Sequence, residues 1–338
     1  DKGQLMTFIE AIRAWKDTYE SLPVRVVILL EGEEESGSES LVPFLHKHKD
    51  ELQADTCIVC DTGMWDPETP AITSRLRGLV YIEATLHGPS HDLHSGSYGG
   101  AVVNPANALT EVLGQLHDED GKIQIEGFYD DVEEVSAEQI TQWNSLGDAD
   151  ALTLESSGSK ATFGEQGFST LERLWSRPTC DINGLRAGYQ GEGAKTVIGA
   201  TATAKISCRL VAHQKPKAIE KALFAFLEER TPVGCHWELK SFGTAPAISV
   251  PTQSPWLSAA SNALTSVFPK PAVLIGTGGS IPVVGEFQEI LGIDAVMVGF
   301  SLDDDLIHAP NEKFDIDCFH RGMLAQASIL EAYANVHV

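Results

Sequence analysis

The chain has 338 residues, of which 43% are hydrophobic and 21% charged, a composition that excludes a disordered protein and allows two domains of ordinary size. Its formal net charge of -24 argues against nucleic acid as a partner, because nucleic-acid binders use clustered Lys and Arg to displace phosphate counterions. No apolar run approaches the ~20 residues of a membrane-spanning helix, so we expect no membrane partner either.

The first sixty residues alternate between helical and strand patterns. Apolar residues recur at helical spacing from Leu5 to Trp15. The apolar run Val24 to Leu30 predicts a buried strand, the stretch from about Ser38 to His48 a helix, and Thr56 to Cys60 a second strand. This alternation is typical of an α/β domain with a doubly wound, mostly parallel sheet.

The middle of the chain has a different pattern. Val80 to His87 alternates between apolar and polar residues, which predicts an antiparallel sheet with one exposed face. Pro105 to Leu116 reads as a helix that Asn104 would cap. Residues between His117 and Gly193 are rich in acids, Ser and Gly, and we interpret them as a long insertion. Three more elements are expected in this α+β unit: the strand Lys205 to Val211, the helix Ala218 to Glu228 and the strand Cys235 to Leu239.

After Pro251 the α/β alternation returns. The expected elements are the helix Trp256 to Val267, the strand Ala272 to Ile275, the strand Ala295 to Gly299 and the helix Cys318 to Tyr333. The sequence therefore predicts a catalytic α/β domain formed by residues 1–78 and 250–338. Residues 79–249 would form an inserted α+β domain with an antiparallel sheet and two helices.

Six cysteines without the spacing of a disulfide framework predict free thiols and a cytoplasmic protein. Cys57 and Cys60 have the spacing of a metal or redox pair. They lie within an apolar strand pattern, however, where residues three apart point to opposite faces of the sheet. We therefore interpret both as core residues.

A run of acids follows the first predicted strand. Glu33, Glu34 and Glu35 would stand at the carboxyl end of that strand, where ligand sites gather in open α/β sheets. Carboxylates packed this closely raise one another's pKa unless a cation offsets their charge. The alternative is a solvated acidic turn before a helix, since Glu and Ser also suit a helix N-terminus.

Two more candidate ligands follow other strands. Asp61 ends the strand at Thr56 to Cys60, and His308 lies in the loop after the last strand. One His and two carboxylates from three strand ends suit Zn or another borderline divalent ion, and carboxylates can also bridge two metals. A lone loop His is otherwise an ordinary surface residue.

A second set of candidates lies in the inserted unit. His94 could donate to a developing oxyanion, and Arg209 could hold a substrate carboxylate with its planar fork. Alternatively, His94 caps a turn among its glycines and Arg209 pairs with a surface acid. The segment Gly276 to Ser280 lacks the Lys-Ser/Thr of a phosphate loop, so we do not expect nucleotide binding.

These segments, in this order, resemble the dinuclear-zinc metallopeptidase family that includes carnosinase-like cytosolic dipeptidases, acetylornithine deacetylase, succinyl-diaminopimelate desuccinylase and glutamate carboxypeptidases. The context of His94 and the long insertion are most similar to the dipeptidase branch. The resemblance is carried by the segments 30–38 (LEGEEESGS), 92–96 (DLHSG), 193–197 (GAKTV), 278–282 (GGSIP) and 308–312 (HAPNE).

The resemblance implies roles for the metal-site candidates. Glu34 corresponds to the general base, Glu35 to a ligand of one metal and Asp61 to a ligand of the other, while His308 shares a metal with Glu35. Two divalent ions are implied, zinc first, with manganese or cobalt as alternatives. The family's first zinc ligand and its bridging carboxylate correspond to sequence upstream of Asp1, so we expect the N-terminal part of the catalytic domain to be absent.

The resemblance also implies a homodimer formed through the inserted domain. His94 would then reach into the partner subunit's active site. Arg209 and Thr196 match positions that hold the substrate, and Ser280 lies in the turn that faces it. The implied activity is hydrolysis of dipeptides or short peptides with a free C-terminal carboxylate. The alternatives are an N-acyl amino acid deacylase with the same site and a truncated, inactive dimeric module.

Overall fold

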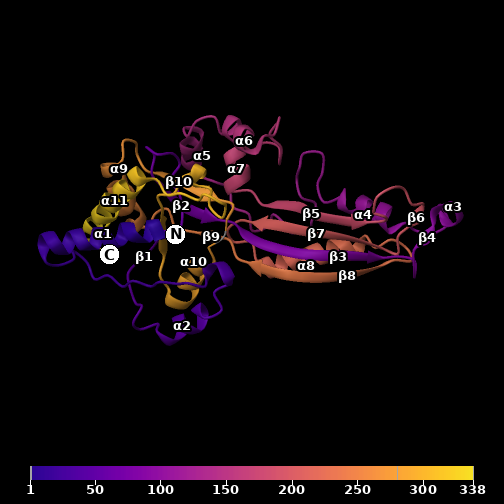
Figure 1. The fold of residues 1–338 in the computed structure, drawn as a ribbon, viewed down its shortest axis with the longest axis horizontal. Coiled ribbons are helices and arrows are strands. Elements are labelled where there is room, and N and C mark those ends of the chain that lie inside the picture. The colour runs from indigo at the N-terminus through magenta and orange to yellow at the C-terminus, as the bar shows by residue number, and fades with distance from the viewer. Residues whose placement is uncertain (1, 280, 338) are drawn as a thin grey trace.

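The computed structural model describes residues 2–279 and 281–337. Figure 1 shows an elongated molecule whose strands lie mainly in a mixed sheet and an antiparallel sheet. A mixed sheet with most of the long helices lies at one end, where both termini are also found. A long antiparallel sheet extends from it to the other end. The predicted combination of an α/β sheet and a separate antiparallel sheet is therefore confirmed.

The mixed sheet contains both strand directions. Its order is β1 (Cys57–Val59), β11 (Ala295–Val298), β2 (Ala71–Leu76) and β10 (Val273–Thr277), and the short β9 (Ile248–Ser249) also pairs with β2. β1 is parallel to β11 and β10 is parallel to β2, whereas β11 and β9 are antiparallel to β2. The carboxyl ends of β1 and β11 consequently lie at the same edge of the sheet.

Three long helices cover this sheet at the end of the molecule. α1 (Lys2–Tyr19) packs on α11 (Ile316–Ala334), which packs on α9 (Pro255–Val267). The apolar faces of α9 and α11 and the fully buried strand β11 form one core. A smaller core joins α2 (Leu41–Lys47) to the segment that follows α10 (Pro282–Glu286).

The antiparallel sheet has the order β5 (Thr179–Ala187), β7 (Thr201–Leu210), β3 (Gly78–His87) and β8 (His236–Ala245). In β3, the even-numbered residues are buried and alternate with partly exposed odd-numbered residues, as the sequence pattern predicted. These buried residues are Val80, Ile82, Ala84 and Leu86. One face of the sheet therefore forms a core and the other is open, as expected for an antiparallel sheet.

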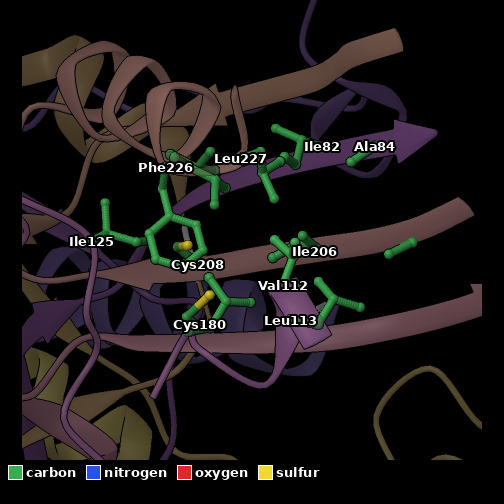
Figure 2. Close-up of a cluster of buried hydrophobic side chains, with 14 of the residues drawn as sticks. Ile82, Ala84, Val112, Leu113, Ile125, Cys180, Ile206, Cys208, Phe226 and Leu227 are labelled. Carbon is green, nitrogen blue, oxygen red and sulfur yellow. The ribbon is translucent and has the colours of Figure 1, made fainter. Parts of the chain in front are cut away.

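Two helices cover the buried face of the antiparallel sheet. α4 (Pro105–Leu113) begins where predicted, and the Asn104 side chain accepts a hydrogen bond from the backbone N–H of Ala106 at 3.0 Å. α8 (Pro216–Glu229) supplies the second apolar surface. Figure 2 shows side chains from both helices packed on the strands, including Val112 and Phe226.

The segment Val24–Leu30 is not a strand, so that prediction is wrong. Val27, Ile28 and Leu30 are 39%, 50% and 65% exposed. β1 is the edge of the mixed sheet, and within the described part of the chain no strand pairs with this segment. Apolar residues favour a strand only where a neighbour supplies backbone hydrogen bonds, and that neighbour is missing here.

The insertion is more ordered than the sequence suggested. It contains α5 (Ala137–Asn144), α6 (Ala149–Ser157) and α7 (Thr170–Trp175), and it ends in β5, an edge strand of the antiparallel sheet. α7 starts with a capping box between Ser169 and Glu172.

The insertion is anchored to the edge of the mixed sheet through backbone hydrogen bonds of Leu274 in β10. The side-chain oxygen of Gln142 accepts from the Leu274 N–H at 3.0 Å, and the Trp143 indole N–H donates to the Leu274 carbonyl at 2.9 Å. Trp143 also packs edge-on against Trp175 at 5.2 Å between ring centroids. The insertion therefore protects this edge of β10 and connects the two sheets.

Arg77 reinforces this connection at the point where the chain passes from β2 into β3. It is 6% exposed, and its guanidinium donates to the backbone carbonyls of Arg173 and Arg177 at the end of α7. Burial and then the nearby charge of Arg209 lower the pKa of Arg77 to about 10. Arg77 thus donates hydrogen bonds to backbone carbonyls at the helix end, where helical carbonyls have no partner within the helix.

The variant Gln142→Leu is expected to destabilise the protein by about 1–3 kcal/mol, because the Leu274 N–H loses its partner in a partly buried place. Urea unfolding measures the change, and hydrogen exchange should become faster at Leu274. Gln53→Leu is the matched control, since the Gln53 amide makes only an exposed bond to the Lys49 carbonyl. Equal stability losses in the two variants would contradict the anchoring role.

Candidate active site

The acidic segment forms a short 3-10 turn, η1 (Glu34–Ser36), rather than the end of a strand. Glu33 stabilises this turn: its carboxylate accepts from the backbone N–H and the hydroxyl of Ser40 at 3.0 and 3.1 Å. Gly37 ends the turn at φ +99°, a conformation that favours glycine. With Glu33 engaged in this way, Glu34 and Glu35 are left to face other groups.

Glu35 and His308 meet although they lie 273 residues apart in the sequence. His308 Nε2 is 2.8 Å from Glu35 Oε1, and both side chains are mostly exposed, at 70% and 75%. The structure thus brings together two of the three predicted metal ligands.

Asp61 lies in the same electrostatic environment. Partial burial, followed by repulsion from Glu35, raises the pKa of Asp61. The pKa of Glu34 is raised by its burial and then by the charges of Glu35, Asp61 and Glu31, in that order. All four predicted residues, Glu34, Glu35, Asp61 and His308, are therefore close enough to act on one another. The pairing of β1 with β11 explains this, because it is continued by a bridge from Gly63 to Ser301.

The chemistry of this group fits a divalent cation. Carboxylates that raise one another's pKa, beside an imidazole, form the mixed O/N donor set that zinc and similar ions prefer. Among the described residues, Glu31 Oε1 and Thr62 Oγ1 are buried with no hydrogen-bond partner. No three His, Cys, Asp or Glu side chains in residues 2–279 and 281–337 are gathered closely enough to ligate one ion as they stand. A cation would replace the direct contact of Glu35 with His308.

The second candidate set lies at the opposite end of the molecule. His94 ends β4 (Leu93–His94), which pairs with β6 (Val197–Ile198) beyond the tip of the antiparallel sheet (Figure 1). Its Nδ1 accepts from the Gly96 N–H at 3.1 Å, and its Nε2 lies 3.4 Å from the Thr196 hydroxyl. His94 does cap a turn, as the alternative interpretation held, but it also meets Thr196, the predicted substrate contact.

Arg209 is separate from both groups within one chain. It pairs across the sheet with Leu79 and Thr179, at the end of β7 that adjoins the mixed sheet. Ser280 lies outside the described residues. A single chain therefore distributes the predicted site residues over at least three places.

Cys57 and Cys60 behave as core residues. Burial raises the pKa of each thiol to about 12, so both stay protonated. Cys57 packs against both neighbouring cores, and Cys60 packs against the larger one. This agrees with the core interpretation rather than with a metal or redox pair.

Arg77, Asp305 and Lys313 lie near the candidate sites but were not singled out from the sequence. Arg77 was missed because an Arg between two strands carries no sign of burial. Asp305 belongs to an acidic run that reads as solvated, and yet it is 1% exposed and 2.7 Å from Lys313 Nζ. A buried carboxylate needs such a partner, but its identity depends on tertiary structure.

The model of peptidase family M20/M25/M40 matches residues 1–332. The chain belongs to this family. The resemblance drawn from the sequence and the hydrolase and metallopeptidase classes are therefore confirmed, and divalent metal ions are the family's cofactors.

Curated relatives point to the dipeptidase branch. The chain is 31% identical to the Cys-Gly metallodipeptidase DUG1 of Saccharomyces cerevisiae, over 99% of this chain and 70% of that protein. It is 30% identical to the human Beta-Ala-His dipeptidase, over 100% of this chain and 68% of that protein.

Solved structures agree with the fold. The M20 family metallo-carboxypeptidase Sso-CP2 from Sulfolobus solfataricus has a TM-score of 0.82 at 31% identity, with 99% of this chain and 76% of that chain covered. Human carnosine dipeptidase 1 has a TM-score of 0.77 at 28% identity, with coverages of 99% and 72%. Among the described residues of this M20 peptidase, no helix is long and apolar enough to cross a membrane.

The raised pKa of Asp61 gives a stability prediction for the metal-free protein. A carboxyl with a raised folded pKa stabilises the fold below its unfolded pKa, and this contribution is lost as the pH rises through the folded pKa. Asp61→Asn should therefore raise the thermal midpoint in EDTA at pH 7, and the gain should shrink below pH ~4, near the unfolded pKa. Scanning calorimetry at several pH values measures this.

Asp66 provides the control of opposite sign. Its partial burial is outweighed by hydrogen bonds from the N–H groups of Glu68 and Thr69 and from the Thr69 hydroxyl, so its pKa is lowered. Its stabilising contribution is present above the unfolded pKa and lost as the pH falls. Asp66→Asn should lower the midpoint at pH 7. Two shifts of the same sign would contradict the assigned electrostatics.

Proposed function

We propose that this M20 peptidase hydrolyses the peptide bond of dipeptides or short peptides that have a free C-terminal carboxylate. The observation that carries the proposal is the contact of Glu35 with His308 beside Glu34 and Asp61, in a chain of a metallopeptidase family. The names of the relatives support the substrate class, since they describe enzymes acting on Cys-Gly and Beta-Ala-His dipeptides.

Glu35, Asp61 and His308 would hold the cations in this proposal. We propose two divalent ions, zinc first, with manganese or cobalt able to replace it, because carboxylate-rich sites accept several ions. Bound there, the ions would supply Lewis acidity that lowers the pKa of water and polarises the scissile carbonyl.

The chain's own residues would perform the remaining steps. Glu34 is the general base: it accepts a proton from the attacking water and delivers it to the leaving amine. Arg209 binds the C-terminal carboxylate of the substrate through its guanidinium, and Thr196 binds the substrate backbone. His94 donates a hydrogen bond to the oxyanion that develops on the carbonyl.

We further propose that His94 serves the active site of a partner subunit. His94 and Thr196 lie at the tip of the antiparallel sheet, at the far end of the molecule from β1, so they cannot join Asp61 within one chain (Figure 1). A homodimer formed through residues 79–249 would bring them to the other subunit's metal site. The separate cores of the two sheets support the domain boundaries at 1–78 with 250–338 and at 79–249.

We propose a cytoplasmic location because the cysteines that the structure describes are not joined in disulfides. In the described part of the chain all six are free thiols, including Cys180 and Cys208, which face each other in the core (Figure 2). Free thiols are typical of a reducing compartment.

Glu34→Gln in the full-length enzyme should keep the metal content and lower kcat by at least about 100-fold, because Gln cannot accept the proton. Metal analysis and turnover of Cys-Gly and Beta-Ala-His are the measurements. Glu39→Gln is the matched control, since Glu39 is an exposed acid of the same segment that lies outside the turn η1. Normal turnover by the Glu34 variant would remove the assigned base.

The same assay separates the alternative functions. Faster turnover of acetyl or succinyl amino acids than of any dipeptide would identify an N-acyl amino acid deacylase. Absence of bound metal and of turnover, even with added zinc or manganese, would identify an inactive dimeric module.

Subunit mixing tests the shared site. Glu34→Gln and His94→Ala are each expected to be inactive, and a mixed dimer would contain one intact site, with Glu34 from one subunit and His94 from the other. After random exchange, half of the dimers are mixed, so activity should return to about a quarter of the wild-type value. The control mixes Glu34→Gln with the double variant, which can form no intact site. Equal activities in the two mixtures would exclude the shared site.

A further inference from the structure

The loop that carries His308 has an unusual backbone. Leu306, His308 and Asn311 adopt φ values of 55°, 62° and 67°, in the left-handed region that residues with a side chain rarely occupy. The sequence from Phe300 to Lys313 contains no glycine that would adopt this conformation freely. Something outside these three residues must therefore hold the loop in shape.

Asp305 closes the base of this loop. It is 1% exposed, and its Oδ1 accepts from Lys313 Nζ at 2.7 Å while its Oδ2 accepts from the Leu302 N–H at 2.8 Å. The Asp305 carbonyl also accepts from the Lys313 N–H at 3.0 Å. Both side-chain oxygens and the backbone oxygen of one buried residue thus join the two ends of a loop that has His308 near its middle.

Lys313 is the partner of Asp305 that a substitution can test. Its ammonium group also contacts Asp304 at 3.1 Å, but Asp304 is exposed. Hydrogen bonds to Asp305 and then to Asp304 raise the pKa of Lys313 to about 12, so the side chain stays charged at neutral pH.

We propose that Lys313 is a positioning residue for metal binding: by pairing with Asp305 it fixes the loop that presents His308 beside Glu35. This inference rests on the proposed metal site, because His308 is a ligand there. A ligand held in its bound geometry binds more tightly, since less freedom is lost on binding.

The sign of the effect separates positioning from simple electrostatics. Removing a positive charge from the neighbourhood of a cation site should strengthen cation binding if charge alone matters. Removing a residue that holds a ligand in place should weaken it. Lys313→Met keeps the length of the side chain and removes its charge and hydrogen bonds.

Lys313→Met in the full-length enzyme is expected to weaken zinc binding about tenfold, the usual effect of losing a residue that orients a metal ligand. Competition with a chromophoric chelator measures zinc affinity without any assay of activity. Lys313→Arg should restore most of the affinity, because it can still pair with Asp305. Asp304→Asn is the matched control and should change the affinity less than about twofold, since it removes only the exposed contact.

Unchanged or tighter zinc binding by Lys313→Met would overturn the inference. Hydrogen exchange in EDTA keeps this outcome distinct from failure of the metal site itself. In the metal-free protein, Lys313→Met should speed exchange in residues 306–312, while Asp304→Asn should leave it unchanged. Equal exchange in wild type and Lys313→Met would show that Lys313 does not order the loop, whether or not zinc binds.

Discussion

The parallel pairing of β1 with β11 is the constraint on which the candidate site depends. Asp61 lies two residues after the end of β1, and the loop that carries His308 follows β11, so this pairing delivers both to one edge of the sheet. The bridge from Gly63 to Ser301 extends the register past the strand ends. Glu35 then reaches His308 from a third segment whose turn Glu33 holds. The candidate ligands converge because backbone hydrogen bonds fix where each strand stops.

The antiparallel sheet has the opposite effect, because it keeps functional groups apart. It extends the fold so far that His94 and Thr196 cannot share a site with Asp61 in the same chain (Figure 1). Its connection to the mixed sheet is nevertheless firm, with Arg77 and Trp143 joining the insertion to both sheets. With His94 and Thr196 at its tip, this arm supports the proposal that a second subunit completes the site.

Much of this fold was predictable from local patterns, and the predictions that failed have a common cause. The alternation in β3 and the Asn104 cap report on single elements, and both were predicted correctly. Val24–Leu30 has the composition of a strand, but no strand in residues 2–279 and 281–337 pairs with it. β5 has the polar composition of a loop but pairs with β7. In both cases the outcome depends on whether another strand is placed to pair with the segment, and the segment's own residues do not show this. The candidate ligands were found through a resemblance and their chemistry, whereas residues that orient them depend on tertiary contacts.

The candidate site gathers several features that oppose folding. Carboxylates there raise one another's pKa, and His308 has a left-handed backbone. Glu31 and Thr62 hold buried oxygens that have no hydrogen-bond partner among the described residues. Such costs persist only where other contacts fix the structure. The cores beneath both sheets and the Asp305–Lys313 pair supply those contacts. A divalent cation would relieve the repulsion among the carboxylates, so the same residues that weaken the metal-free fold should give the ion its affinity.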